Sequence, residues 1–180
     1  MLQLSKTYYD QAIMSLRTGG QIAFATEPLI NPKNLKIEGF FCQDKFEKKE
    51  LILLTQDIRD RLPQGFAVDD HSVLAEPVDL VRHREILEIR YRLPGKPVIA
   101  GKRKKLGKVV DYAVEAETMY IQKLYVGQHL LKSLTKGQLS VTRDRIIEIT
   151  PKHIKIKDPK EPIKHAEKVT NSATAPAIAR

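Results

Sequence analysis

Short runs of alternating apolar and polar residues dominate this chain, and Gly, Pro, Asn or Asp bounds most of them. In the clearest run, Ile154 and Ile156 alternate with Lys155 and Lys157, so the isoleucines share one face of a strand. The segment 145–149 precedes this run and ends in a Thr-Pro-Lys turn. The two segments predict a terminal hairpin, and many such short runs are typical of an all-β sandwich or barrel.

The chain contains two copies of one pattern, at residues 13–70 and 97–158. Each copy has a short apolar strand, a Gly followed two residues later by a β-branched residue, and an alternating segment that ends in three apolar residues (37–42 and 121–126). Each copy then closes on an alternating strand that ends in Asp. A repeated pattern indicates a repeated structural unit. We therefore predict two tandem small β-barrels, at residues 1–70 and 97–158.

A stretch of different character, residues 71–96, lies between the copies. Pro77 suits the first turn of a helix, and Leu80, Val81 and Leu87 fit one helical stripe. We expect a linker with a short helix here. Residues 159–180 have no sustained apolar periodicity, which predicts a flexible tail.

Charge is divided unequally between the two halves of the 180-residue chain. Residues 1–90 carry 12 Lys/Arg and 14 Asp/Glu, whereas residues 91–180 carry 19 and 8, a net charge of −2 against +11. Such asymmetry favours an anionic partner for the basic half: RNA, DNA, an acidic protein or a lipid surface. The alternative is that the charge only keeps the second copy soluble.

Part of the second copy resembles the PRC-barrel family. The resemblance lies in residues 95–98 (GKPV), 106–112 (LGKVVDY) and 121–126 (IQKLYV), and the terminal hairpin completes it. The first copy is less similar, because its Gly20-Gln21-Ile22 lacks the preceding Leu and the following Asp. The resemblance implies a small β-barrel without catalytic residues that docks to a larger protein or ribonucleoprotein assembly. Known members include a domain of a ribosome maturation factor and a domain of a photosynthetic reaction-centre subunit.

Motifs for catalysis, metals or cofactors do not emerge from the sequence. The five histidines have no metal-ligand spacing, and no Gly-x-Ser-x-Gly elbow occurs. The segment 101–108 has five residues between its glycines, and Val109 stands where a phosphate loop needs Ser or Thr. Cys42, the single cysteine, lies in an apolar run and is predicted to be a buried small hydrophobe. We expect no enzyme activity, no cofactor and no metal, and a cytoplasmic location.

The candidate binding residues are therefore basic. One group lies on the predicted hairpin around residue 101, and a second on the terminal hairpin and the segment before it. These candidates are Lys102, Arg103, Lys104, Lys105 and Lys108, and then Arg143, Arg145, Lys152, Lys155 and Lys157. Clustered cations neutralise phosphates and release counterions, which makes binding salt-dependent. The alternative is a charged turn that keeps a strand edge soluble.

Three roles remain open for a protein of this pattern. The first is an RNA- or ribonucleoprotein-associated adaptor, for example in ribosome maturation. The second is a protein–protein scaffold that uses strand edges and the linker helix. The third, peripheral attachment to an anionic membrane surface, ranks last because no strongly amphipathic helix is visible.

Overall fold

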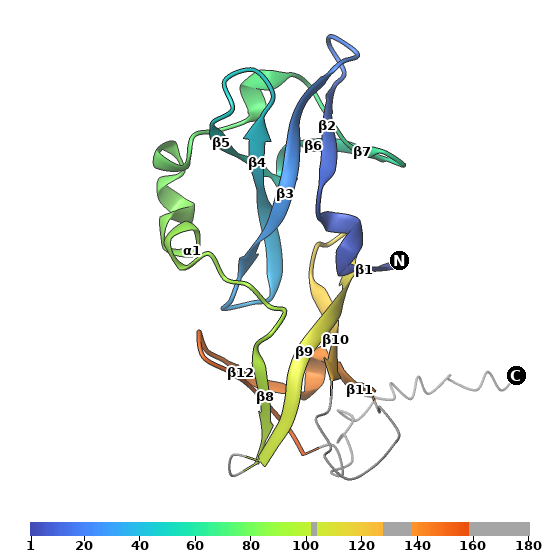
Figure 1. Ribbon diagram of the computed structural model, residues 1–180, viewed down its shortest axis with the longest axis vertical. Helices are drawn as coiled ribbons and strands as arrows, with labels where there is room; N and C mark the ends of the chain where they lie inside the picture. Colours follow the sequence, from blue (N-terminus) through green and yellow to red (C-terminus); the bar gives the residue numbers. More distant parts are fainter. Residues whose placement is uncertain (102–103, 128–137, 159–180) are drawn as a thin grey trace, which may run out of the picture.

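The computed structural model describes residues 1–101, 104–127 and 138–158 and is mainly β, as the sequence predicts. Figure 1 shows one sheet above the other along the long axis. The first sheet consists of β2 (Gln11–Ser15), β3 (Gln21–Asn31), β4 (Lys36–Asp44), β5 (Glu50–Leu54), β6 (Ile58–Leu62) and β7 (Gly65–Val68). The second consists of β1 (Leu2–Leu4), β8 (Pro97–Ala100), β9 (Lys104–Glu115), β10 (Ile121–Gly127), β11 (Gln138–Thr142), β12 (Ile146–Ile149) and β13 (Ile154–Ile156).

The two sheets share one topology. Their strand orders are β5-β4-β3-β2-β7-β6 and β11-β10-β9-β8-β13-β12, so each strand of the first sheet has a counterpart six strands later. In both sheets the first strand pairs in parallel with the closing strand, β2 with β7 and β8 with β13. Both also have a β-bulge in the long hairpin, at Thr26 and at Val110. The strands matched by sequence pattern therefore take equivalent places in the fold.

Neither sheet closes into a barrel within the described residues, which corrects the predicted closed form. Closure would require the edge strands β5 and β6, or β11 and β12, to bond to one another. In the first sheet the linker occupies part of that edge: Ala75 and Ile52 exchange backbone hydrogen bonds of 2.8 and 3.0 Å. The edge of β5 is thus paired with the linker in place of β6.

The N-terminal residues cross from the first half to the second sheet. Strand β1 pairs with β9, with Gln3 opposite Val114. At the junction the Ile37 N–H donates to the Met119 carbonyl (2.9 Å), and the Ile121 N–H donates to the Leu35 carbonyl (2.8 Å). The predicted first unit at residues 1–70 therefore contributes a strand to the second sheet, and backbone hydrogen bonds join the two halves directly.

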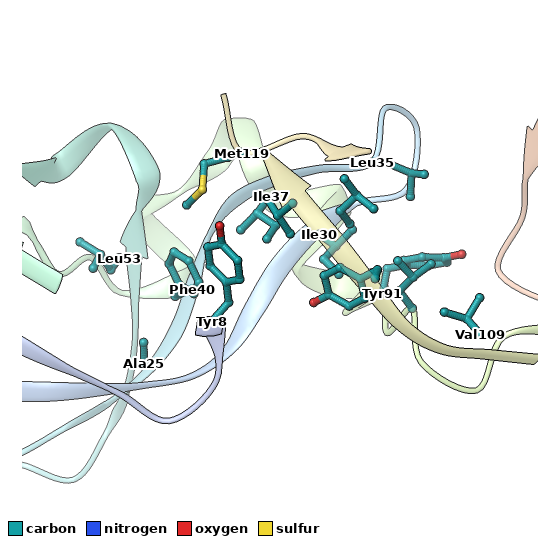
Figure 2. Packing of buried hydrophobic residues seen from close by; sticks show 14 of the residues in the cluster. Tyr8, Ala25, Ile30, Leu35, Ile37, Phe40, Leu53, Tyr91, Val109 and Met119 are labelled. Carbon is teal, nitrogen blue, oxygen red and sulfur yellow. The ribbon is translucent and has the colours of Figure 1, made fainter. Parts of the chain in front are cut away.

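One hydrophobic cluster runs through both halves. It extends from Leu53 and Phe40 in the first half to Val109 in the second, with Tyr8 and Met119 between them, as Figure 2 shows. The chain has no Trp and few aromatic residues, so most of this cluster is Ile, Leu and Val. Domains of about 60 residues bury so little surface that they are only marginally stable alone, so a shared core strengthens both halves.

The linker is helical only in part. Pro77–Asp79 and Val81–His83 form single 3₁₀ turns, and the α-helix α1 is Arg84–Ile89. Leu80, between the turns, has ψ near 59°, which interrupts a continuous helix from Pro77. The remaining 3₁₀ turns are Ser5–Tyr8, Thr55–Asp57, His71–Val73 and Arg143–Arg145. The helix is therefore shorter and later than the apolar stripe predicts.

The linker covers the outer face of the first sheet, the face turned away from the shared core. Ile86 of α1 packs in a second apolar cluster with Leu29, Phe41, Ile52 and Leu54. Figure 1 shows α1 beside the first sheet, with no counterpart beside the second. The described residues thus leave the outer face of the second sheet without a helical cover.

Candidate functional site

Three predicted lysines share the outer face of the second sheet. Lys105 pairs with Ile99 and Lys108 with Pro97, and these two β8 residues are two positions apart on one face. A bulge at Leu106 brings both lysines to that face. On the other side of Ile99 lies Lys155 of β13. We call Lys105, Lys108 and Lys155 the lysine face.

The equivalent positions of the first sheet carry no charge. Matching strand registers place Gln21 where the second sheet has Lys105, and Phe24 where it has Lys108. Ala67 takes the position of Lys155. Two copies of one topology therefore differ at all three positions in the same direction, from uncharged to basic.

The lysine face is open and electrostatically unbalanced. Lys105 and Lys108 are exposed and Lys155 is half-buried, and no ion pair within the described part of the chain involves any of them. Lys105 and Lys155 line a shallow groove of about 460 Å³ together with Pro97, Ile99, Gly101, Glu148 and His153. Glu148 is the register partner of Lys155 and is the acidic residue of this groove. Cations held on a sheet without ion-pair partners favour the approach of an anion, and Glu148 offsets part of this charge beside Lys155.

The other predicted lysines surround this face. Lys104 begins β9 beside Ala100, and exposed Lys157 follows β13 on the same side of the strand as Lys155. Lys152 is exposed in the turn between β12 and β13. Lys102 and Arg103 lie outside the described residues. The two hairpins predicted to be basic are therefore neighbours in the sheet, because β8 of the first hairpin pairs with β13 of the second.

The two predicted arginines have structural contacts. The Arg143 guanidinium donates to the carbonyls of Asn34 (2.5 Å) and Ile121 (3.2 Å) and lies 4.8 Å from the centre of the Tyr120 ring. Arg145 donates to the Asp158 carbonyl (3.3 Å). Arg143 thereby joins the two halves of the molecule, and the lysines are the freer cations of the predicted set.

Sequence reasoning did not select Lys123. It lies on β10 before buried Leu124, pairs with Thr142 and is half-buried on the outer face. The alternation of Ile121–Gly127 contains the signal that could have found it, because Lys123 and Tyr125 alternate with Leu124 and Val126. Of the tyrosines in β9, in β10 and between them, Tyr112 is fully buried, whereas Tyr120 and Tyr125 are partly exposed.

Two groups that could support catalysis, Cys42 and Asp44, are buried in the fold. Cys42 is buried, as predicted, and burial raises the pKa of its thiol to about 12. Burial also acts to raise the pKa of Asp44, but hydrogen bonds from the Glu47 N–H and from His71 (2.6 Å) outweigh it and hold this pKa below its usual value. Among the described residues no group of three His, Cys, Asp or Glu could hold a metal ion.

In comparisons with known proteins, no family model and no curated protein sequence matches this chain. None of the helices in the described ranges has the length and apolar character needed to cross a bilayer.

Proposed function

We propose that this protein is a non-catalytic adaptor that binds RNA or a ribonucleoprotein through the lysine face of its second sheet. The observation that carries this proposal is the change at three equivalent positions, from Gln21, Phe24 and Ala67 to Lys105, Lys108 and Lys155. Solubility alone would not require these charges to align on one face, on two strands that flank β8. A polyanion whose phosphates repeat along its length fits such an arrangement.

We also propose that the chain is a divergent tandem member of the PRC-barrel family, located in the cytoplasm. The Leu106-Gly107-Lys108-Val109-Val110-Asp111 segment supports this, because it is the most specific part of the resemblance. Within it, Gly107 has φ near 145° and packs against the backbone of the next strand. A Cβ at Gly107 would lie 1.9 Å from the Gly127 carbonyl oxygen. The family's closed barrel would here be an open sheet.

The direct test is binding of a labelled RNA hairpin by fluorescence anisotropy at several salt concentrations. The variant Lys105→Gln/Lys108→Gln/Lys155→Gln is expected to weaken binding. It should also reduce the slope of log K against log[salt] by about 0.7 to 0.9 for each phosphate that the variant no longer neutralises. The matched control, Lys6→Gln/Lys45→Gln/Arg82→Gln, removes the same charge from exposed sites elsewhere. Equal affinity and slope in the two triple variants would contradict the proposal.

A second candidate role is a protein scaffold, and the linker favours it. Val78 and Val81 are 79% and 76% exposed, and with Pro77 and Leu87 they line a groove of about 460 Å³. The variant Val78→Ser/Val81→Ser is expected to release a protein partner that survives nuclease treatment. A nuclease-resistant partner that still binds this variant would exclude the groove as its site.

A further inference from the structure

The second sheet has an aromatic residue at a position that the linker covers in the first sheet. Register places Tyr125 on β10 where Phe41 lies on β4, because Phe41 pairs with Glu27 and Tyr125 pairs with Asp111 across the equivalent bulges. Phe41 is 3% exposed, and the Arg90 guanidinium lies 4.1 Å from its ring centre. A flat cationic group of the linker therefore stacks on this position in the first sheet.

The side chains around Tyr125 are smaller and more polar than those around Phe41. Phe41 lies among Leu29, Ile52 and Leu54 beneath the linker helix. The equivalent positions around Tyr125 are Ala113, Ser140 and Thr142. This second set is too small and too polar for an apolar helix to cover it favourably. Tyr125 is partly exposed and has no ring contact among the described residues.

Lysines lie on the same face on both sides of Tyr125. Lys123 is two residues earlier on β10 and therefore shares its face. On the other side, Gly127 is two residues after Tyr125 on β10, and Lys108 is its partner on β9. Lys108 also adjoins Val110, whose side chain packs over Gly127. From Lys123 through Tyr125 and Lys108 to Lys105, the outer face carries three lysines with one aromatic ring between the first two, and Asp111 lies across from that ring. Cations along a backbone path beside an aromatic platform are what single-stranded nucleic acids require.

We propose that Tyr125 stacks a nucleobase of single-stranded RNA or DNA while Lys123 and Lys108 contact the flanking phosphates. The proposal rests on the proposed function, and it narrows the partner from nucleic acids in general to an unpaired strand. A base in a duplex is stacked between its neighbours and presents no face to a side chain, whereas an unpaired base does.

The test uses the full chain with two labelled probes, a 12-nucleotide oligouridylate and an RNA duplex of 12 base pairs, measured by fluorescence anisotropy. Wild-type protein is expected to bind the oligouridylate more tightly than the duplex. Tyr125→Ala should weaken oligouridylate binding by about 5- to 100-fold, and Tyr125→Phe should retain most of it. Tyr125→Leu keeps an apolar side chain but has no flat ring, so it should weaken binding as the alanine variant does.

The control is Phe24→Ala, which removes an aromatic side chain, 46% exposed, from the outer face of the first sheet. This variant should bind both probes as the wild type does. If Tyr125→Ala and Tyr125→Leu bind oligouridylate with wild-type affinity, the stacking proposal is overturned while the lysine face retains its role. If wild-type protein binds neither probe nor the RNA hairpin, the proposed function fails as well. Thermal unfolding of each variant shows whether the fold is intact.

Discussion

The two sheets of this protein have the same strand order and the same bulge, but they use their outer faces differently. The first face is apolar at Leu29, Phe41, Ile52 and Leu54 and is covered by the linker. The second has Ala113, Tyr125, Ser140 and Thr142 at the equivalent positions, carries its lysines elsewhere on the same face, and has no helical cover among the described residues. The inner faces, by contrast, join in one hydrophobic cluster. The topology therefore constrains the inner face of each copy, while the outer face is free to be either apolar and covered or polar and open.

The largest expected effect is a difference in stability between two alanine variants, one at the covered Phe41 and one at the open Tyr125. Phe41→Ala should lower the free energy of unfolding by about 3 to 5 kcal/mol, because it leaves a cavity beneath the linker and removes the ring that Arg90 contacts. Tyr125→Ala should cost less than about 1 kcal/mol, since its ring is already partly solvated. Urea unfolding of both variants measures the difference. Similar losses would mean that the two outer faces are equally important for stability.

Shortening the helix side chain that covers the first sheet should have the next largest effect. Ile86 is 7% exposed within the apolar cluster under α1, so Ile86→Ala should cost about 2 to 3 kcal/mol. Hydrogen exchange should then increase at the backbone amides of β5, which the linker protects. RNA binding by the lysine face should remain unchanged, because that face does not contact α1. Reduced binding would show that the cover of one sheet supports the surface of the other.

Acidification should weaken the attachment of the linker through Glu27. Burial acts to raise the pKa of this carboxyl, but hydrogen bonds from Arg92 and Arg90 outweigh it and hold the pKa below its usual value. The contribution of Glu27 is therefore fully present above the unfolded-state pKa near 4.3 and is lost as pH falls through the folded-state value. Glu27→Gln should lose less stability than wild type between about pH 5 and pH 3, by about 1 kcal/mol. Parallel stability curves for the two proteins would exclude this ion-pair contribution.

The smallest effect is expected from giving the first sheet part of the charge of the second. Gln21→Lys/Phe24→Lys introduces the residues found at Lys105 and Lys108, at two accessible positions. The fold should remain, with a change in stability within about 0.5 kcal/mol. The salt dependence of RNA binding should steepen by at most about 0.7 to 0.9 in slope for each additional phosphate that is neutralised. A large increase in affinity would show that charge alone, without the open face around Tyr125, is sufficient for binding.

The alternation of apolar and polar residues predicted the strands whose formation depends mainly on residues close in sequence. The terminal hairpin forms as its alternation predicts, with Ile149 opposite Ile154. The burial of Cys42 and the equivalence of the strands in the two copies also follow from short segments of sequence. The start of α1 at Arg84 was not predictable in the same way, because the apolar stripe from Pro77 is compatible with either 3₁₀ turns or a longer helix.

The sequence by itself determined the strands, the repeat and the excess of positive charge in the second half, because side-chain alternation and composition are local properties. Tertiary structure decided the contacts between distant segments. It placed β1 against β9, paired Ala75 with Ile52 and left both sheets open within the described residues. It also brought Lys105 and Lys155 to either side of Ile99. Register between strands depends on how whole faces pack, and a shift of one residue would turn these lysines to the opposite face.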